Sequence, residues 1–377
     1  MEMKLRKLLP LVGALCLGLT STAFAHSNYQ NGNGSSSYSS SSSMDSSSSQ
    51  GTYQRGTFRE ITPNAGPRVA HGADVFITAD FIWWKVSEDG LFFASSGAAN
   101  DQGAAVKGKA SAVGEDWAPG FKVGLGLNLG HDGWDLFTQY TWLHASNTKS
   151  QKGDFLFIPE ILPFANGPSV SGTEARASWK THFNVIDLEL GRNFYTSQYL
   201  TLRPFFGLKG TWQSHDFSST LTSSDLKLSD SNADSFPGTA DMKKKYDFWG
   251  IGVRGGLQTG WYFTKCWSIY GNLALTSLWT NYHKHTQTLD FTNSTTGTTA
   301  SAINIDNDDS YTCRFVSELE LGLRWETWFY DDNYHFAIQA GWQQQNWINL
   351  SNFHEVLDNN TSDFSTQGLN LKFRFDF

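Results

Sequence analysis

Five histidines lie near polar or acidic residues and are the first candidates for chemistry: His144, His182, His215, His283 and His285. His283 and His285 flank Lys284, and residues two apart in a strand share a face, so the two imidazoles could hold a metal ion together. His215 precedes Asp216, and an acid beside an imidazole could orient a general base. No spacing here is specific to a catalytic family, and most such histidines are solvated rim residues. We therefore expect no enzyme, no metal site and no cofactor.

Charged residues form a second candidate set, because they recur on one face of alternating segments. In residues 318–326 the odd positions hold leucine and tryptophan, whereas Glu318, Glu320, Arg324 and Glu326 hold even positions. This period-2 pattern predicts a strand with one apolar and one polar face. Charges are prohibitively costly in a dry core, so an interior that holds them must be wet or crossed by ion pairs. The residues that we place on the inward, polar faces are Asp80, Lys122, Asp135, Asp187, Glu189, Arg203, Lys209, Arg254, Glu318, Glu320, Arg324, Glu326, Lys372, Arg374 and Asp376.

Ten such segments must position these residues. They cover 73–86, 118–130, 134–144, 178–193, 200–214, 246–262, 267–282, 311–327, 334–346 and 368–377. Four connections are short, at 131–133, 194–199, 263–266 and 328–333, and alternate with long ones at 87–117, 145–177, 215–245, 283–310 and 347–367. Outer-membrane barrels alternate in this way, with short periplasmic turns and long extracellular loops. We predict an all-β, transmembrane, antiparallel up-and-down β-barrel of about ten strands, or about twelve if a long loop holds another hairpin.

Tryptophans recur at both ends of the predicted strands. Trp249 and Trp261 share a face, as do Trp267 and Trp279, and each pair is 12 residues apart. At about 3.3 Å per residue and a tilt of about 45°, this spacing spans roughly 28 Å, close to the ~25 Å apolar band of such barrels. We predict a girdle at the turn end that includes Trp134, Trp261, Trp267 and Trp328, and one at the loop end with Trp117, Trp142, Trp212, Trp249, Trp279 and Trp347.

The two ends of the chain carry their own signals. Residues 1–25 have a basic start, an apolar run and the small-x-small sequence Ala23-Phe24-Ala25, which together predict a secretory signal peptide. Residues 26–72 are Ser-rich, with almost no aliphatic side chain over 27–57, and are expected to be disordered. The barrel is expected over 73–377. Phe377 ends an alternating strand, and we interpret it as the signal that barrel-assembly machinery recognises.

Composition and charge exclude two classes of protein. No apolar run reaches the about 20 residues of a membrane-spanning helix, and a net charge of −8 argues against a nucleic-acid binder. Cys266 and Cys313 remain after the signal peptide, and the predicted topology places them at opposite membrane faces. They therefore cannot form a disulfide with each other.

Two segments resemble a known family. These are LNLGHDGWDLFTQYTWLH at 127–144 and DLELGRNFYTSQYLTLRPFFGLKGTW at 187–212, and WAPGFKVGLG at 117–126 and the final FRFDF are similar to the same family. The chain resembles the pore-forming major outer membrane protein-like (porin) family of Legionella and chlamydia-related bacteria over about residues 73–377. The resemblance implies a general-diffusion porin that is abundant at the cell surface, and it offers no active-site residues.

We expect a porin that lets small hydrophilic solutes and ions diffuse across the bacterial outer membrane. The main alternative is a structural or adhesive surface barrel with a closed lumen, since barrels of so few strands are narrow. Inward glycines such as Gly124 and Gly126 would widen the bore by leaving wall without side chains. The five long connections hold 20 acidic and 10 basic residues, which predicts a weak cation preference at low salt.

The expected partners follow from the membrane location. They are outer-membrane lipid and lipopolysaccharide, the barrel-assembly machinery and a second copy of this chain, with no nucleic acid. Lys243, Lys244 and Lys245 form a short basic run at the base of a predicted loop. We interpret this run as a solvated face, with contact to lipopolysaccharide phosphate as the alternative.

Overall fold

The computed structural model describes residues 65–69, 72, 74–96, 108–130, 132–156, 172–226, 236–307, 309–351 and 362–377. The predicted signal peptide at 1–25 and the Ser-rich segment up to residue 64 lie outside the described residues. No helix in the described part of the chain is both long enough and apolar enough to cross a membrane.

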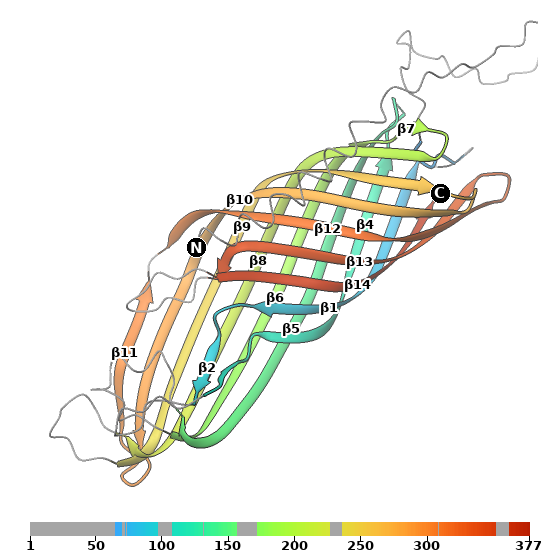
Figure 1. Cartoon of the computed structure of the whole chain (residues 1–377). Coiled ribbons are helices and arrows are strands. Elements are labelled where there is room, and N and C mark those ends of the chain that lie inside the picture. Colours follow the sequence, from blue (N-terminus) through green and yellow to red (C-terminus); the bar gives the residue numbers. More distant parts are fainter. Residues whose placement is uncertain are drawn as a thin grey trace, which may run out of the picture. The chain divides into compact units, whose positions relative to one another are not determined.

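Ten strands form a closed antiparallel barrel, and each pairs with the barrel strands before and after it in the chain (Figure 1). They are β1 (Val75–Glu88), β4 (Glu115–Asn128), β5 (Trp134–Leu156), β6 (Gly172–Arg192), β8 (Leu200–Leu226), β9 (Phe236–Tyr262), β10 (Trp267–Asn293), β12 (Ser310–Phe329), β13 (Tyr334–Ser351) and β14 (Ser362–Asp376). β14 pairs with β1 to close the ring, and backbone hydrogen bonds of 3.0 and 3.3 Å join Val75 and Phe377. The predicted ten-strand, up-and-down barrel is confirmed.

Four short strands lie in the connections. β2 (Phe92–Ser95) and β3 (Ala110–Ala112) pair with each other between β1 and β4. β7 (Phe194–Ser197) pairs with β8 at the turn end, and β11 (Thr299–Asn307) pairs with β10 at the loop end. Residues 65–69 also lie against the turn end, where Arg68 donates a hydrogen bond of 2.8 Å to the carbonyl of Leu129.

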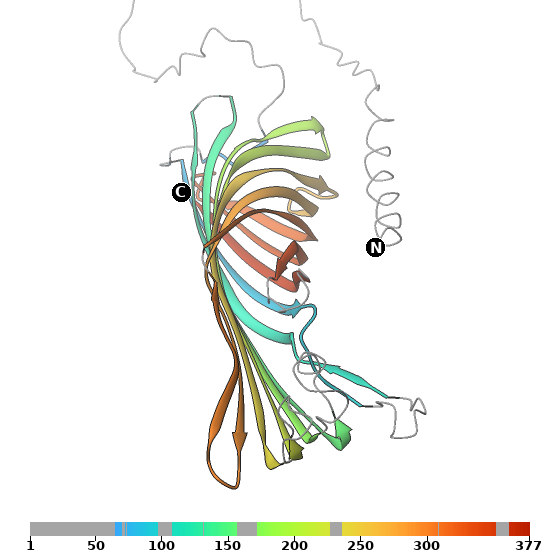
Figure 2. The same cartoon turned by 90° about the vertical axis from the view of Figure 1, so that its left-hand side faces the viewer.

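The predicted long loops at 145–177, 215–245 and 283–310 were wrong over much of their length, because strands continue through them. β8, β9 and β10 have 27 residues each, whereas β1 and β4 have 14. Figure 2 shows the strands coloured green to orange reaching farther at the loop end than the red ones. The barrel therefore has a loop-end extension built mainly from β5, β6, β8, β9 and β10.

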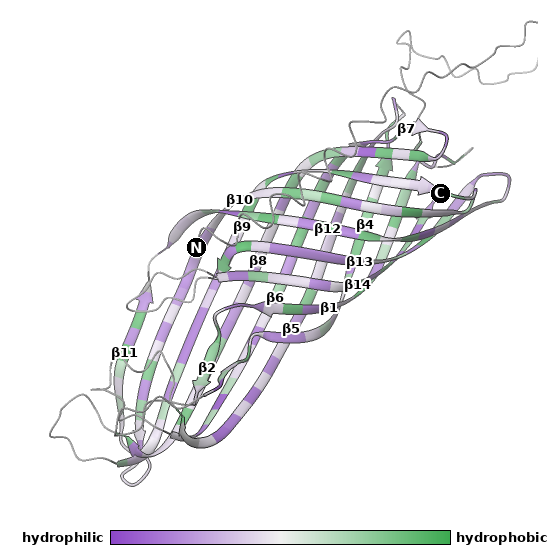
Figure 3. Ribbon diagram, in the orientation of Figure 1, coloured by the Kyte–Doolittle hydropathy of each residue, from purple (hydrophilic) through white to green (hydrophobic). Residues whose placement is uncertain are grey.

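The polarity of the two strand faces changes along the barrel. On β8 the outward side chains of Phe206, Leu208 and Trp212 are exposed, and beyond them Asp216 occupies the outward face while Leu221 is buried inside. Figure 3 shows the alternation of apolar and polar residues along the strands. Exposed apolar side chains in a continuous band suit hydrocarbon rather than water, so this band is the membrane belt. Beyond the belt the strands have the polarity of a water-soluble barrel.

The sequence suggested that inward glycines would widen the bore. In the structure, other side chains occupy the space beside them. A Cβ atom on Gly126 would lie 2.0 Å from the ring of Phe76, and one on Gly124 would lie 2.7 Å from the ring of Phe137. The aromatic rings therefore occupy the space that the missing side chains leave. The two rings also stack on each other, with centroids 5.6 Å apart. The prediction that these glycines widen the bore was wrong.

Candidate functional site

The middle of the bore is filled by charged side chains from β6, β8, β9 and β12. Lys209 Nζ lies 2.8 Å from Asp187 Oδ1 and 2.9 Å from Glu318 Oε1. Arg254 Nη1 lies 3.1 Å from Asp187 Oδ1 and 3.0 Å from Glu189 Oε1, and its Nη2 lies 3.0 Å from Glu318 Oε2. We call these five residues the charged layer. Ion pairs, one of the two alternatives that the sequence left open, cross the interior here.

Ion pairs continue from the charged layer around the bore. Arg203 Nη1 lies 3.0 Å from Glu189 Oε2, and its Nε donates a hydrogen bond of 2.9 Å to Asp135 Oδ2. Elsewhere on the wall, Lys372 Nζ lies 3.6 Å from Asp80 Oδ2. These side chains are largely shielded from solvent, so removal of any one charge would leave an unbalanced partner in a poorly hydrated place.

Apolar side chains pack the loop-end half of the bore. Trp84, Trp179, Phe183 and Trp347 have no exposed surface, and the rings of Phe183 and Trp347 pack edge to face with centroids 5.5 Å apart. We call this cluster the apolar layer. Each of the ten barrel strands contributes to it, for example through Trp84, Ala118, Leu143, Phe183, Phe217, Phe248, Leu278, Val316, Trp347 and Phe364. The side chains of this layer are packed as in a protein core.

A single carboxylate, Glu88, lies within the apolar layer. It accepts hydrogen bonds of 2.6 Å from Trp179 Nε1 and from the Tyr246 hydroxyl, and one of its oxygens lies 3.0 Å from His215 Nδ1. Burial alone would raise the pKa of Glu88, but the charge of His215 and the hydrogen bonds from His215 and Tyr246 outweigh it and hold the pKa below its ordinary value. Lys85 points outward three residues earlier, which places Glu88 beyond the membrane belt.

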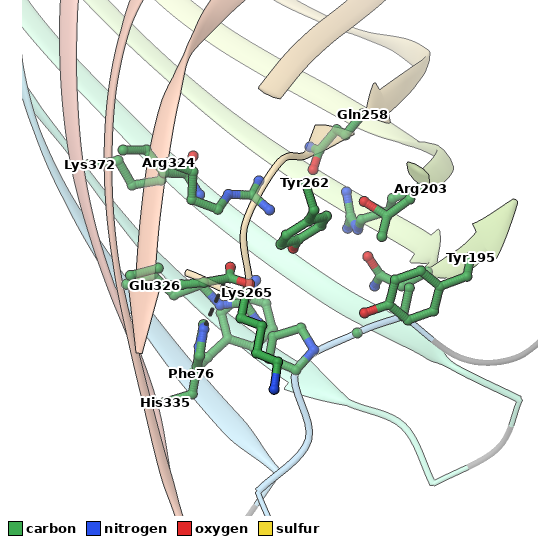
Figure 4. Close-up of a pocket in the computed structure, with 18 of the residues that line it drawn as sticks. Phe76, Tyr195, Arg203, Gln258, Tyr262, Lys265, Arg324, Glu326, His335 and Lys372 are labelled. Carbon is green, nitrogen blue, oxygen red and sulfur yellow. Dashed lines mark ion pairs between the residues drawn. The ribbon is translucent and has the colours of Figure 1, made fainter. Parts of the chain in front are cut away.

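The turn-end part of the bore is hollow. A cavity of about 610 Å³, which we call the turn-end cavity, opens beside the exposed Tyr199. In Figure 4, Arg324 and Arg203 project toward Tyr262 from opposite sides, and a dashed line joins Glu326 to His335. Among the described residues that line the cavity, Glu326 is the only carboxylate, and the basic side chains are Arg203, Lys265, Arg324, His335, Lys372 and Arg374.

The predicted lumen residues all lie on inward strand faces. Those not yet placed also have partners: Glu320 accepts a hydrogen bond of 2.8 Å from the Tyr270 hydroxyl, and Lys122 donates one of 2.5 Å to Gln343 Oε1. Arg374 pairs with Asp376 two residues later on β14. The structure places these residues on inward faces, and their role in lining an open lumen and in conduction stays a prediction.

The predicted girdle tryptophans face outward, with one correction. Trp134 is half-buried, and the exposed fractions lie between 37% and 58% for Trp249, Trp261, Trp267, Trp279 and Trp328. Trp347 was assigned to the loop-end girdle and is instead fully buried. Outward residues on β13 have even numbers, such as Ile338 and Trp342, so Trp347 shares the inward face with Gln345.

The proposed shared face of His283 and His285 was wrong. A register shift in β10 between Tyr282 and Lys284 rotates the strand, and it leaves His283 exposed while His285 is buried. No cluster of three or more His, Cys, Asp or Glu residues in the described part of the chain could hold a metal ion.

The other histidines lie in two separate places. His215 is buried, with Nδ1 near Glu88 and Nε2 lying 3.2 Å from Gln213 Oε1, while the neighbouring Asp216 points outward. His144 and His182 lie side by side on the outer face, with their Nδ1 atoms 3.1 Å apart. His215 and Asp216 therefore lie on opposite faces of β8, and Asp216 cannot orient the His215 imidazole as a general base.

The lysine run divides between two faces. Lys243 is exposed and Lys245 is half-buried on the outward face, whereas Lys244 is buried, so the prediction of a fully solvated run was wrong at Lys244. The cysteines are exposed and free. Cys266 lies in the turn between β9 and β10, and Cys313 lies opposite Trp279 toward the other end of the belt.

Comparison with known proteins gives one match to a family. The family described as Legionella pneumophila major outer membrane protein precursor matches residues 67–377. No curated protein matches the chain.

Solved structures of outer-membrane proteins show a distant likeness. The outer membrane protease OmpT from Escherichia coli has 12% identity and a TM-score of 0.31, over 80% of this chain and 96% of that chain. A Pseudomonas aeruginosa FadL homologue has 8% identity and a TM-score of 0.26, over 80% and 89%. The Ralstonia pickettii toluene transporter TbuX has 11% identity and a TM-score of 0.28, over 81% and 90%. Similarity this low carries no argument about activity.

Proposed function

The chain belongs to the Legionella pneumophila major outer membrane protein family, and from this premise we propose that it is a structural barrel whose bore is closed. The family and the membrane belt place it in the bacterial outer membrane. The apolar layer carries the proposal, because all ten barrel strands contribute to it and its buried members are at most 6% exposed. A water-filled pore would hydrate the side chains along its path.

The charged layer is a second barrier in the same bore. Lys209 has no exposed side-chain surface and contacts carboxylates from β6 and β12. A solute that passed this level would have to separate Lys209 or Arg254 from its partners, and breaking buried pairs of this kind costs about 3–5 kcal/mol. The two layers together support a closed barrel rather than an open channel.

The loop-end extension suits a structural role at the cell surface. β8, β9 and β10 rise beyond the belt with polar outward faces and an apolar interior. An extension with its own packed core holds its shape without lipid around it. We propose that it presents a rigid surface outside the membrane, as a structural or adhesive protein requires.

Single-channel recording in a planar bilayer tests the closed bore. The purified protein is first shown to be folded by its heat-modifiable migration on a gel, and a known open porin in the same bilayer serves as the positive control. We expect the folded protein to give no discrete conductance steps. Regular steps from the folded wild-type protein would contradict the proposal.

A porin is the second candidate, and the turn-end cavity favours it. The cavity is hollow, polar and part of the bore, so opening the two layers above it would create a continuous path. In that case we propose passive diffusion of small hydrophilic solutes and ions. Because the segments predicted as loops hold 20 acidic and 10 basic residues, the expected preference is weakly for cations and fades as salt rises. A reversal potential that shows strong anion preference would contradict it.

We propose no enzymatic activity. Both ring nitrogens of the buried His215 already have partners in Glu88 and Gln213, which leaves that imidazole without a free position for a substrate proton. Loss of a measured activity on substitution of His215 or His283 would revive the enzyme interpretation.

The proposed partners are those of a barrel in this membrane. The exposed apolar side chains of the belt support contact with outer-membrane lipid and lipopolysaccharide. The same belt and the exposed thiol of Cys313 are accessible to a second copy of the chain. Assembly through Phe377 by the barrel-assembly machinery stays a prediction. Cross-linking in intact cells would identify these neighbours.

A further inference from the structure

We propose that the turn-end cavity binds a sugar-sized solute that carries a phosphate or carboxylate group. The proposal goes beyond the structural role and does not depend on whether the bore conducts. The cavity measures about 610 Å³, and sites for small molecules commonly measure about 300–1,000 Å³. By the convention of outer-membrane barrels its mouth faces the periplasm, so the ligand would come from that side.

The charge of the lining residues favours an anion. Two of the lining bases, Arg324 and Lys265, form no ion pair within 4.0 Å among the described residues, and the polar neighbours of Arg324 on the cavity wall are Tyr262 and Glu326. An anion in the cavity would give the guanidinium group of Arg324 the partner of opposite charge that it lacks at ion-pair distance. Arg324 also lies over the ring of Tyr270, at 5.6 Å from its centroid, which fixes its direction.

The other arginines at the cavity are held by carboxylates behind them. Asp135 and Glu189 hold Arg203. Asp376 accepts hydrogen bonds from both Nε and Nη2 of Arg374, with its Oδ2 lying 2.9 Å from Arg374 Nε. These carboxylates balance most of the charge, but they do not line the cavity. A solute would therefore meet several cationic nitrogen atoms and one carboxylate, that of Glu326. A guanidinium group binds phosphate or carboxylate through paired hydrogen bonds.

Neutral polar side chains complete the wall and define the rest of the ligand. Among the lining residues are Thr201, Gln258, Asn272 and Gln339, together with the aromatic ring of Tyr262. Amides and hydroxyls placed around one charged anchor suit a body with several hydroxyl groups, and the ring offers a flat apolar face. An anionic sugar has both features.

Isothermal titration calorimetry on the folded, detergent-solubilised protein tests the proposal. Glucose 6-phosphate and glucuronate are the anionic probes, and glucose is the neutral control with the same ring. We expect at least one anionic sugar to bind about tenfold more tightly than glucose, since a charged hydrogen bond is roughly twice as strong as a neutral one. The preferred anionic sugar identifies phosphate or carboxylate as the recognised group. Equal binding of all three sugars, or binding of none, would overturn the proposal.

Substitution of the anchor locates the site. Arg324→Gln should weaken binding of the preferred anionic sugar about tenfold, and Arg324→Lys, which keeps the charge but loses the paired geometry, should weaken it less. The matched control is Arg176→Gln, which removes an exposed arginine from the outward face of β6 and should leave binding unchanged. Heat-modifiable migration shows that each variant is folded. Wild-type affinity in a folded Arg324→Gln variant would refute this assignment.

Discussion

Replacement of Glu88 by alanine tests whether the apolar layer is organised around its buried carboxylate. Glu88 joins side chains from three other strands of the barrel: Trp179 on β6, His215 on β8 and Tyr246 on β9. The substitution leaves three donors in an apolar surrounding without their acceptor. We expect the loop-end extension to lose stability while the belt remains in the membrane.

The size of the loss follows from the contacts. Removal of one partner of a buried, hydrogen-bonded pair costs about 3–5 kcal/mol, and a single buried donor left without an acceptor costs about 1–3 kcal/mol. The hydrogen bonds from Trp179 and Tyr246 are 2.6 Å long, which fits bonds to a charged acceptor. We therefore expect Glu88→Ala to lower the free energy of opening the loop-end extension by about 3–5 kcal/mol.

Native-state hydrogen exchange measures this free energy at the backbone amides of β6, β8 and β9. The control is Asp216→Ala, which removes an exposed carboxylate 3.5 Å from Lys245 and should cost about 0–1 kcal/mol. If Glu88→Ala changed exchange in the loop-end extension no more than Asp216→Ala does, the reasoning about the buried carboxylate would be wrong.

The same contacts predict a dependence on pH. The pKa of Glu88 in the folded protein is below its ordinary value of 4.5, so the carboxylate stabilises the fold at every pH above that value. The contribution is lost as the pH falls through the lower, folded-state pKa. The difference between the wild type and Glu88→Gln should therefore shrink as the pH falls below 4.5. A difference that grows below pH 4.5 would contradict the direction of the shift.

Four further substitutions test other parts of the barrel. Leu275→Lys places a charge on the belt, where the side chain is 61% exposed to lipid, and should cost about 2–4 kcal/mol in urea unfolding from vesicles. Gly126→Ala forces a Cβ into the ring of Phe76 and should cost about 1–3 kcal/mol, seen as less folded protein on a heat-modifiable gel. Arg254→Gln leaves carboxylates of the charged layer unpaired and should cost about 3–5 kcal/mol, seen as a lower Tm. Trp347→Ala empties part of the apolar layer and should cost about 3–5 kcal/mol by urea unfolding, with no change in membrane insertion.

The membrane belt could be predicted from the sequence because its pattern is complete there. In residues 318–326 each outward position is apolar and most inward positions are charged, so the side-chain period of a strand is visible without a partner. The turn ends are also marked: β6 ends at Arg192 where 193 was expected, and β10 begins at Trp267 as expected. Short turns flanked by girdle aromatics leave little freedom in where a strand ends.

The loop-end strands could not be predicted in the same way. Their outward positions are polar, their inward positions are apolar, and serine residues interrupt the apolar positions. In residues 215–226 the outward positions hold Asp and Ser or Thr, while Ser219 and Ser223 interrupt the inward apolar series of Phe217 and Leu221. A segment so rich in hydroxyl residues resembles a loop when it is taken alone. Pairing with β6 and β9 makes it a strand, and that information lies elsewhere in the chain.

The interior contacts depend on positions across the bore. The period-2 pattern placed Arg254 and Glu318 on inward faces. These residues are 64 apart in sequence, and their strands, β9 and β12, both pair with β10 rather than with each other. Their contact follows from the curvature of the closed barrel. Parity alone could have found two features that were missed: Glu88 follows Trp84 and Val86 on the inward face, and Trp347 follows Gln345.

The closed bore that we propose and the length of the strands would have one physical cause. Inside the belt, lipid covers the outward apolar side chains, so the interior can remain polar and even hollow, as at the turn-end cavity. Beyond the belt the outward face meets water, and the strands must bury their apolar side chains somewhere to stay folded. The one place left is the axis of the barrel, where Trp84, Phe183 and Trp347 meet. We therefore propose that this barrel closes its bore because its strands extend beyond the membrane, and that polar side chains in place of these three would open it.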